Sequence, residues 1–486
     1  MLNVLETILE HKRNVIGNTP DYTELEASQR SFFDALSKPH YGFIMECKKA
    51  SPSKGLIRAE FDLDDIVPVY DQYADAISVL TEERFFRGSF SNLQKARELT
   101  DKPLLCKDFI LSPKQIRQAR HFGADAVLLM LSVLNDRDYK VCEEQAEALN
   151  MDVLTEVHTE VELERAIKLD AKIIGINNRN LKDLSTSFEH TKALVQKVPA
   201  DRLVITESGI NTHQDVLELS QFSDACLVGS SLMKEVNLEL AARQLVYGDI
   251  KVCGVTQQSD CDFLQTSPVS SVGLIFAPNS KRFVTHKAIS STKPLVGVFQ
   301  DQSINEVVAS AQDYKLQIVQ LHGDETIQLA QEIKQQLPSV KVSKVFHVGE
   351  QLSVENLTSE LKALLETFDE VLLDTEVTNK AQSQRGGTGV TFDWSLLSQL
   401  DSDLRATKLR IAGGVSADNI QQLKKLGVVK VDLSSSVESS PGIKSEALLE
   451  EFFSHCRPQS GRYHSKSTAP VLGSNLTRVA VGGISS

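Results

Sequence analysis

The chain has 486 residues, of which 41% are hydrophobic and 24% charged, and its formal net charge is −13 at pH 7. This length exceeds what one hydrophobic core usually organises, so we expect two domains of about 200 to 250 residues each. The acidic balance argues against a general nucleic-acid binder, although local basic residues can still bind a small anion.

Membrane insertion and secretion are not indicated by the sequence. No apolar run approaches the roughly 20 residues that a membrane span needs, and the first residues lack the basic start and the cleavage site of a signal peptide. The seven cysteines are scattered and include no C-x-x-C pair, so neither a disulfide framework nor a zinc site is expected. These features predict a cytoplasmic protein in a reducing compartment.

The first half alternates short apolar runs with charged, helix-favouring stretches. Stretches such as 114–123 and 159–170 place their apolar residues three or four apart, as amphipathic helices do. Apolar strands between such helices indicate a parallel α/β sheet buried on both faces, and eight repeats favour a closed barrel. The expected strands are 41–48, 76–81, 103–109, 126–130, 152–158, 173–178, 203–210 and 225–231.

The second half repeats this pattern, and the stretch 237–249 reads as the helix that leads into it. Two fused (β/α)8 TIM barrels are therefore predicted, over residues 1–250 and 251–456. Residues 457–486 are rich in Ser and Gly and lack a sustained period, which predicts a disordered tail. The expected strands are 252–256, 271–276, 295–300, 318–323, 342–348, 370–375, 409–415 and 428–436.

Polar residues that end the apolar strands of the first half are the candidates for chemistry, because active sites of such barrels form at the C-terminal strand ends. Glu46 and Lys48 are two residues apart and therefore share one face of their strand. A barrel mouth with two lysines and three glutamates can supply a general acid and a general base, whereas structural ion pairing is the alternative for any single residue. The candidate catalytic residues are Glu46, Lys48, Lys107, Glu156, Asn177 and Glu207.

Small residues follow the seventh and eighth strands, where these barrels commonly bind phosphate through backbone N–H groups and a short helix N-terminus. The segment SPSKG (51–55) suits a loop that closes over a phosphorylated substrate, with an ordinary solvated turn as the alternative. The candidate substrate-binding and phosphate-binding residues are Ser51, Arg179, Ser208, Gly209, Gly229 and Ser230.

In the second half, Cys253 and Asp374 end the first and sixth strands, and this pair can perform acid–base catalysis. A lone cysteine there is more often a small buried hydrophobe, and it acts as a base only if a nearby cation or helix N-terminus stabilises its thiolate. Arg282 could bind a substrate anion or form an ion pair, and His322 could titrate or only hydrogen-bond. Backbone donors for phosphate are expected at Gly387, Gly389, Gly413, Gly414, Ser434 and Ser435.

Two known families resemble the two halves. Residues 1–248 resemble indole-3-glycerol-phosphate synthase through ECKKASPSKG, LLCKDF, TEVH, GINNRNL, ITESGI and LVGSS. Residues 251–455 resemble phosphoribosylanthranilate isomerase through KVCGVT, FAPNSKRFV, VQLHG, VLLDT, GGTGVTFDW, IAGGV and VESSPGIK. The order matches the fused enzyme of some bacteria. One departure is Ser445, which stands where the isomerase family usually has the Asp of PGIKD.

The resemblance implies two consecutive steps of tryptophan biosynthesis. In the C-terminal barrel, Asp374 would be the general acid and Cys253 the general base of an Amadori rearrangement of phosphoribosylanthranilate. In the N-terminal barrel, Lys107 would be the general acid and Glu156 the general base of a ring closure that releases carbon dioxide and water, with Lys48 as the other possible proton donor. No metal or organic cofactor is implied, and phosphorylated small molecules are the expected partners of a monomeric chain.

Three alternatives remain open from the sequence. A pair of sugar-phosphate isomerases, such as those of histidine biosynthesis, would share the barrel and the Amadori chemistry but favours an Asp/Asp couple over Cys253 with Asp374. A degenerate barrel kept for phosphate binding would have lost acid–base residues, and none of the expected ones is missing. The third alternative is one active half beside one structural half.

Overall fold

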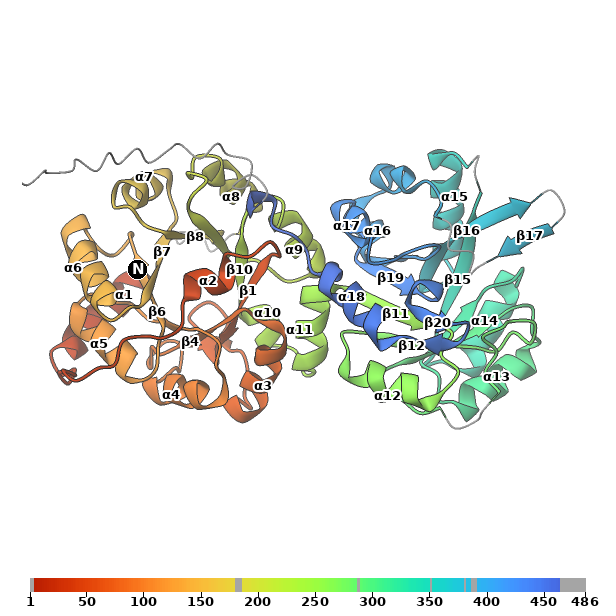
Figure 1. The fold of residues 1–486 in the computed structure, drawn as a ribbon, viewed down its shortest axis with the longest axis horizontal. Helices are drawn as coiled ribbons and strands as arrows, with labels where there is room; N and C mark the ends of the chain where they lie inside the picture. Colours follow the sequence, from red (N-terminus) through yellow and green to blue (C-terminus); the bar gives the residue numbers. More distant parts are fainter. Residues whose placement is uncertain are drawn as a thin grey trace, which may run out of the picture.

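The computed structural model describes residues 4–179, 186–285, 289–349, 352–379, 382–385 and 391–463. The two halves of the chain lie side by side as two barrels, the first running from red to yellow-green and the second from green to blue (Figure 1). In both, parallel strands form the inside and helices surround them. The prediction of two fused α/β barrels is thereby confirmed. Among the described residues, no helix is long and apolar enough to cross a membrane.

Eight parallel strands close the first barrel, and each pairs with the next strand along the chain until β10 pairs with β1. Every residue of β1 is buried, because one face of the strand points into the barrel and the other toward the helices. A separate hairpin of β2 and β3 follows β1. The barrel strands are β1 (Gly42–Cys47), β4 (Ala76–Leu80), β5 (Leu104–Lys107), β6 (Ala126–Met130), β7 (Asp152–Val157), β8 (Ile173–Asn177), β9 (Leu203–Glu207) and β10 (Ala225–Val228), and the hairpin strands are β2 (Ala50–Ser51) and β3 (Gly55–Leu56).

The helices of the first barrel begin at residues that favour helix N-termini. Ser89, Asn135 and Thr159 each accept a backbone N–H of the following helix with their side chains, which satisfies donors that the helix itself leaves open. The helices are α1 (Val4–Ile16), α2 (Phe32–Leu36), α3 (Leu63–Tyr73), α4 (Phe90–Leu99), α5 (Pro113–His121), α6 (Asp136–Ala148), α7 (Glu160–Lys168), α8 (Phe188–Val195), α9 (His213–Leu219), α10 (Ser230–Met233) and α11 (Leu238–Tyr247).

The second barrel is also closed by eight parallel strands, since β15 pairs with β16 and thereby joins the two ends of the sheet. Its first strand begins at Asp249 rather than at residue 252 and ends at Cys253, so GVT lies in the loop. The barrel strands are β11 (Asp249–Cys253), β12 (Ser271–Ile275), β13 (Leu295–Phe299), β14 (Ile318–Leu321), β15 (Lys341–Val348), β16 (Glu370–Asn379), β18 (Leu409–Ile411) and β19 (Lys430–Leu433), and β17 (Gln382–Arg385) extends β16 as an antiparallel partner.

Helices again alternate with these strands in the second barrel. Ser445, the departure from the family pattern, caps the last helix by accepting the backbone N–H of Leu448, so the residue that replaces Asp keeps a capping role. The elements are α12 (Gln258–Thr266), α13 (Ile304–Asp313), α14 (Ile327–Gln336), α15 (Val354–Leu365), η1 (Trp394–Gln399), α16 (Ser402–Thr407), α17 (Ile420–Lys425), η2 (Ser435–Val437), β20 (Glu438–Ser440), β21 (Ile443–Lys444) and α18 (Glu446–Cys456).

Gly248 links α11 to β11 at the junction of the barrels. Its φ of 81° lies in the region that favours glycine, and a Cβ there would be 2.4 Å from the carbonyl oxygen of Val429. The turn therefore needs a residue without a side chain. Because β11 starts at Asp249, we propose that the second domain begins there.

A buried contact between His213 and Lys424 fixes the two barrels against each other. Lys424 Nζ lies 2.9 Å from His213 Nε2 and donates to the carbonyl of Tyr247 at 2.7 Å, while His213 Nδ1 lies 2.8 Å from the carbonyl oxygen of Leu245. Burial lowers the pKa of both side chains. A neutral His213 can donate to Leu245 and accept from Lys424 at once, so the joint is satisfied when this histidine is uncharged.

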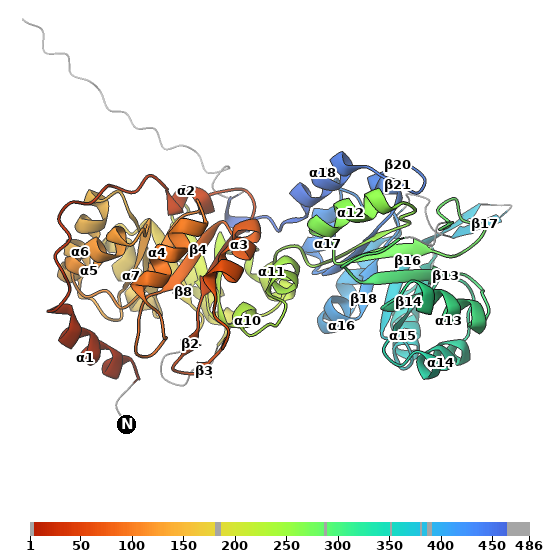
Figure 2. The ribbon, with the colours of Figure 1, turned by 90° about the horizontal axis from the view of Figure 1, so that it is seen from below.

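Residues 457–463, which we call the C-terminal strap, leave α18 and run back to the first barrel (Figure 2). Tyr41 donates its backbone N–H to Pro458 at 2.7 Å, and Ser460 donates to the carbonyl of Pro39 at 2.9 Å. Gly461 adds a bond to Ser220 at 2.8 Å. The prediction of a disordered tail is wrong for this segment, because its partners lie on the other barrel, where no local pattern reveals them. Residues 464–486 lie outside the described part of the chain.

Ending the chain at Cys456 is expected to lower the free energy of unfolding of the first barrel by about 2 kcal/mol, because a buried carboxylate loses a charged donor. In the strap, Arg457 lies 2.6 Å from the buried carboxylate of Asp75. Urea unfolding of this truncated chain, compared with a chain that ends at residue 463, measures the difference. Equal stability of the two chains would show that the strap only rests on the surface.

Candidate active sites at the two barrel mouths

A cavity of 460 Å³ opens at the C-terminal ends of the strands of the first barrel. All the candidate residues that the sequence proposed for this half line it, although they come from strands and loops far apart in the chain. They are Glu46, Lys48, Ser51, Lys107, Glu156, Asn177, Arg179, Glu207, Ser208, Gly209, Gly229 and Ser230. The structure thus brings these residues together, and their roles remain predictions.

Charges alternate across the floor of this cavity. Lys48 Nζ lies 2.5 Å from Glu46 Oε1, so the two side chains that were expected to share a face also form an ion pair. Lys107 Nζ lies 3.9 Å from Glu46 Oε2 and donates to the carboxylate of Glu207. Glu46 and Glu207 are both buried, so each carboxylate depends on a lysine for its compensation.

The pKa values of these groups differ from their ordinary values. Burial raises the pKa of Glu207 to about 7, although Lys107 opposes the change and Glu156 adds to it. Burial also disfavours charge on Glu46 and Lys107. Lys48 and Lys107 nevertheless hold the pKa of Glu46 below its ordinary value. Glu207 and Glu46 hold the pKa of Lys107 above its ordinary value. The site therefore combines a stable cation with a carboxyl that titrates near neutral pH.

Asn177 and Arg179 connect the strand ends to the hairpin that follows β1. Asn177 on β8 is in register with Glu207 on β9, and its Oδ1 accepts the backbone N–H of Arg179 at 3.0 Å. Arg179 in turn donates to the hydroxyl of Ser53 at 2.9 Å. Arg179, which follows β8, thus holds the segment SPSKG at the cavity through this hydrogen bond.

The phosphate end predicted from the small residues lies at β9 and β10. Ser208 and Gly209 follow β9 with φ values of 68° and 83°. Gly229 precedes the short helix α10, and a Cβ at this position would lie 2.4 Å from Glu46 Oε1. The glycine therefore has a second role that the sequence did not indicate, because it leaves room for the buried carboxylate of Glu46.

The apolar residues that line the cavity wall were not predicted from the sequence. Helix α1 closes one side of the cavity and is tied to the barrel by the pair of Lys12 and Asp108, at 2.6 Å. Apolar residues of a site have the same sequence pattern as core residues, so no signal distinguishes them before the chain is folded. The wall includes Val4, Leu5, Ile8, Leu80, Phe86, Phe109, Leu128, Met130, Ile210 and Leu227.

In the second barrel, the candidate base Cys253 lies beside a buried ion pair. Lys251 Nζ donates to Asp432 Oδ2 at 2.8 Å and to Gln320 Oε1 at 2.9 Å, and Lys251 is only 1% exposed. Neither Lys251 nor Asp432 was predicted from the sequence. The spacing alone indicates Lys251, because it lies two residues before Cys253 and therefore shares its face of the strand.

Burial strongly affects the pKa values of Cys253 and Asp374, the candidate acid–base pair of the second barrel. Burial raises the pKa of the Cys253 thiol, while the ammonium groups of Lys251 and Lys444 oppose the change. Burial likewise raises the pKa of Asp374 to about 6. His322 Nε2 lies 3.7 Å from Asp374 Oδ2, and burial lowers the pKa of His322 to about 4, so this imidazole is neutral at pH 7.

Arg282 takes part in an ion pair inside the second barrel mouth. Its Nε and one terminal nitrogen donate to the carboxylate of Glu438, at 3.0 and 2.8 Å. Lys444 Nζ donates to the same carboxylate at 2.7 Å and to the backbone oxygen of Cys253 at 2.5 Å. The ion pair expected as an alternative for Arg282 therefore exists, although it is half-buried rather than at the surface. Its contact with a substrate anion stays a prediction.

The structure describes four of the six residues that were predicted to bind phosphate in the second barrel. Gly413 and Gly414 follow β18 with φ of 71° each, and Ser434 precedes η2, in which Ser435 is the first residue. A Cβ on Gly413 would lie 3.0 Å from Asp374 Oδ1, so this turn runs close to the candidate acid. The remaining two candidates, Gly387 and Gly389, lie outside the described residues.

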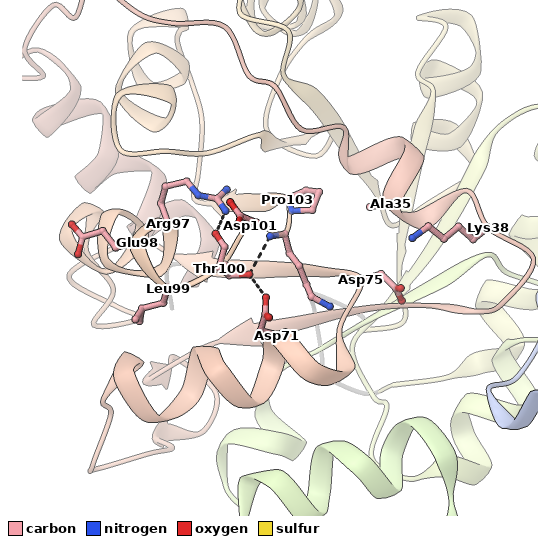
Figure 3. A pocket seen from close by; sticks show the side chains of 11 residues that line it. Ala35, Lys38, Asp71, Asp75, Arg97, Glu98, Leu99, Thr100, Asp101 and Pro103 are labelled. Carbon is pink, nitrogen blue, oxygen red and sulfur yellow. Dashed lines mark hydrogen bonds between the residues drawn. The ribbon is translucent and has the colours of Figure 1, made fainter. Parts of the chain in front are cut away.

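A second hollow, of 640 Å³, lies among α2, α3 and α4 near the starts of the first-barrel strands (Figure 3). Two of its polar groups bind neighbouring lining residues: Thr100 donates to Asp71, and Arg97 donates to the carbonyl of Thr100. Lys102 Nζ donates to the carbonyl of Ala74 at 2.5 Å. Catalytic residues of such barrels come from the other ends of the strands. We therefore assign this hollow no catalytic role.

Comparison with known proteins gives matches for both halves. Residues 5–245 match the family "Indole-3-glycerol phosphate synthase", and residues 250–455 match the family "N-(5'phosphoribosyl)anthranilate (PRA) isomerase". The tryptophan biosynthesis protein TrpCF of Vibrio parahaemolyticus is 47% identical over 440 residues, which are 89% of this chain and 88% of that protein. The TrpCF protein of Vibrio cholerae is 46% identical over 441 residues, 89% of this chain and 90% of that protein.

Among solved structures, the phosphoribosyl anthranilate isomerase of Thermotoga maritima is 29% identical and covers 43% of this chain and 98% of its own, with a TM-score of 0.36. The two family matches together span nearly all of residues 5–455, in the order that the sequence motifs indicated. The chain therefore belongs to the family of bifunctional tryptophan-biosynthesis enzymes that join an indole-3-glycerol phosphate synthase, a lyase, to a phosphoribosylanthranilate isomerase.

Proposed function

We propose that each barrel performs one of the two reactions at its own mouth, with the second barrel acting first. The observation that carries this proposal is the separation of the two acid–base groups. Lys107 and Glu156 lie at the cavity of the first barrel, whereas Cys253 ends β11 and Asp374 lies within β16 of the second, although the sequence had placed it at the strand end. Neither set shares a residue with the other, so each reaction has its own proton donors and acceptors.

For the isomerase, Asp374 protonates the ring oxygen of N-(5-phosphoribosyl)anthranilate, and the furanose ring opens to an imine. Cys253 then removes the proton from C2 of the ribose, and the enolamine that forms rearranges to carboxyphenylamino-deoxyribulose phosphate. The raised pKa of Asp374, about 6, supports a carboxyl that can donate a proton. Lys251 and Lys444 oppose the desolvation of Cys253 and so favour its thiolate.

Anion binding in the second barrel is proposed from its loops and its arginine. Gly413, Gly414, Ser434 and Ser435 lie after β18 and β19, where backbone N–H groups of such barrels bind phosphate. Gly387 and Gly389 complete this proposed set. Arg282 would bind the anthranilate carboxylate with donors that its ion pair with Glu438 does not use.

For the synthase, Lys107 donates a proton to the ketone oxygen of carboxyphenylamino-deoxyribulose phosphate while the aromatic carbon attacks the carbonyl carbon. Loss of carbon dioxide restores the aromatic ring. Glu156 then removes a proton from the newly closed ring as water is lost. The product is indole-3-glycerol phosphate. Lys107 is favoured over Lys48 as the proton donor, because its contacts with both Glu46 and Glu207 keep its ammonium group protonated at this buried position.

Substrate placement in the first barrel is proposed from the two sides of the cavity. The apolar side, with Phe86 and Phe109, suits the aromatic ring of the substrate. At the other side, Ser51 and the backbone of Ser208, Gly209, Gly229 and Ser230 would bind the phosphate, and Arg179 holds the hairpin of Ser51 at the cavity. Glu46, Lys48, Asn177 and Glu207 would orient and polarise the reacting carbons.

Steady-state turnover of both substrates by two variants tests the two-site assignment. Glu156→Gln is expected to lower synthase turnover by roughly 100-fold or more and to leave the isomerase unchanged, because a general base contributes at least that factor. Cys253→Ala is expected to do the reverse. The unaffected activity of each variant is the control for folding. A variant that loses both activities, or neither, would contradict two independent sites.

We also propose that the chain acts as a cytoplasmic monomer. The second barrel already covers part of the first through the buried joint of His213 and Lys424. The seven cysteines, all in described segments, are free and buried, which suits a reducing compartment. Sedimentation velocity measures the oligomeric state.

A further inference from the structure

His158 lies between two carboxylates at the mouth of the first barrel, and the mechanism above does not use it. Its Nε2 lies 3.3 Å from Glu156 Oε1, and its Nδ1 lies 3.6 Å from Glu162 Oε2. The side chain of His158 is 9% exposed, so little solvent competes for these contacts. The proposed general base therefore has an imidazole as a close neighbour.

The chain fixes this arrangement locally. His158 comes directly after β7 and two residues after Glu156, so its side chain lies on the same side of the chain as Glu156. Thr159 then caps α7, which places Glu162 in the first turn of the helix. Glu162 Oε2 accepts the backbone N–H of His158 at 2.7 Å, and this bond holds the carboxylate against the imidazole.

Charged groups from three elements favour the imidazolium form of His158. Burial alone lowers its pKa, but Glu162 on α7, Glu156 on β7 and Glu207 on β9 outweigh burial and raise the pKa above its ordinary value. From α8, His190 Nε2 lies 2.8 Å from the backbone oxygen of His158 and so contacts its main chain rather than its ring. The imidazolium therefore faces the carboxylate of Glu156 at 3.3 Å.

The surroundings of Glu156 explain why such a cation would matter. Glu46 and Glu207 are buried at the same cavity, and each disfavours a further negative charge there. Lys48 and Lys107 are already engaged with Glu46 and Glu207. His158 is thus a basic side chain within ion-pair distance of Glu156, in addition to Lys107, which interacts with Glu156 from farther away.

We propose that His158 is a positioning residue of the synthase: its imidazolium, held by Glu162, contacts the carboxylate of Glu156 and fixes it in place for proton removal. This proposal rests on the role of Glu156 as general base in the proposed function. His158 itself does not touch the reacting atoms. It acts through Glu156.

His158→Gln tests the proposal through its separate effects on the kcat and KM of the synthase. We expect kcat to fall about 10-fold with a small change in KM, because the base is misplaced while the contacts that bind the substrate are unchanged. The isomerase activity of the same chain reports folding and should not change.

Glu162→Gln gives a second arm that keeps the helix start intact. The amide oxygen can still accept the backbone N–H of His158, but the negative charge that favours the imidazolium is gone. The synthase kcat should fall by a smaller factor than in His158→Gln. Glu164→Gln, an exposed position on the same helix, is the matched control and should leave kcat unchanged.

The Glu156→Gln background separates a positioning role from a structural one. If His158 acts through Glu156, adding His158→Gln to Glu156→Gln should reduce the residual activity no further. A loss of equal size in both backgrounds, or a His158→Gln variant with an unchanged kcat, would overturn the proposal. If Glu156→Gln itself stayed active, the general-base assignment would fail first. If that variant were inactive while His158→Gln behaved as wild type, only the present proposal would fail.

Discussion

Replacing Lys107 by Met is expected to lower synthase turnover by roughly 10³- to 10⁴-fold, near the upper end of what one general acid contributes. The reason is that this lysine has two tasks: it would donate the proton to the substrate, and it contacts the buried carboxylates Glu46 and Glu207. Without it, the pKa of Glu207 should rise further, because Lys107 is the group that opposes the effect of burial. Single-turnover kinetics of the synthase half-reaction measures the loss.

The same change is expected to reduce stability by about 3 kcal/mol, as removal of one partner of a buried pair usually does. The double variant Lys107→Met with Glu207→Gln restores the charge balance and should recover much of this stability. It should not recover activity, since the proton donor is still absent. Activity that returned with the charge balance would show that Lys107 has only an electrostatic role and that Lys48 is the donor.

Asp374→Asn is expected to lower isomerase turnover by about 10³-fold, because an amide cannot protonate the ring oxygen. Asp369→Asn, a change directly before the same strand, is the matched control. Asp369 accepts the backbone N–H of Val342 at 2.8 Å, and an amide oxygen can do the same. The isomerase should therefore tolerate this second change. Equal losses in the two variants would contradict the assignment of Asp374.

The pH profile of the isomerase carries a more specific expectation. The pKa of Asp374 is about 6, and that of Cys253 lies above its ordinary value, yet the reaction needs Asp374 protonated and Cys253 ionised. The active form is then a minor one whose fraction is constant between the two pKa values. Wild-type kcat/KM should be flat across neutral pH, fall below about pH 6, and fall again above the pKa of the thiol.

The Asp374→Asn variant should lose this plateau. Only the ionisation of Cys253 then controls its residual activity, which should rise with pH through the neutral range until the thiol has ionised. A residual activity that stayed flat between pH 6 and 9 would show that the plateau has another origin than these two groups.

The sequence by itself determined the number and order of the barrel strands and most of the candidate site residues. All the expected strands of both barrels are present, because a buried parallel strand needs a short continuous apolar run and its covering helix needs the 3.6-residue period. That Glu46 and Lys48 lie on the same side also followed from the sequence, because residues two apart on a strand share a face. In each case the pattern and its physical cause lie within a few residues.

Only the tertiary structure decided which distant groups meet. Closure of the barrels brings Lys107 to Glu207, Lys251 to Asp432 and Arg282 to Glu438, which are 100, 181 and 156 residues apart. The strap shows the same limit, since its backbone partners lie on the other barrel and its composition favours disorder. The cavity wall was likewise hidden, because an apolar side chain that faces a substrate and one that faces the core have the same local pattern. Such contacts depend on where the chain returns in space, and no property of a short segment encodes that position.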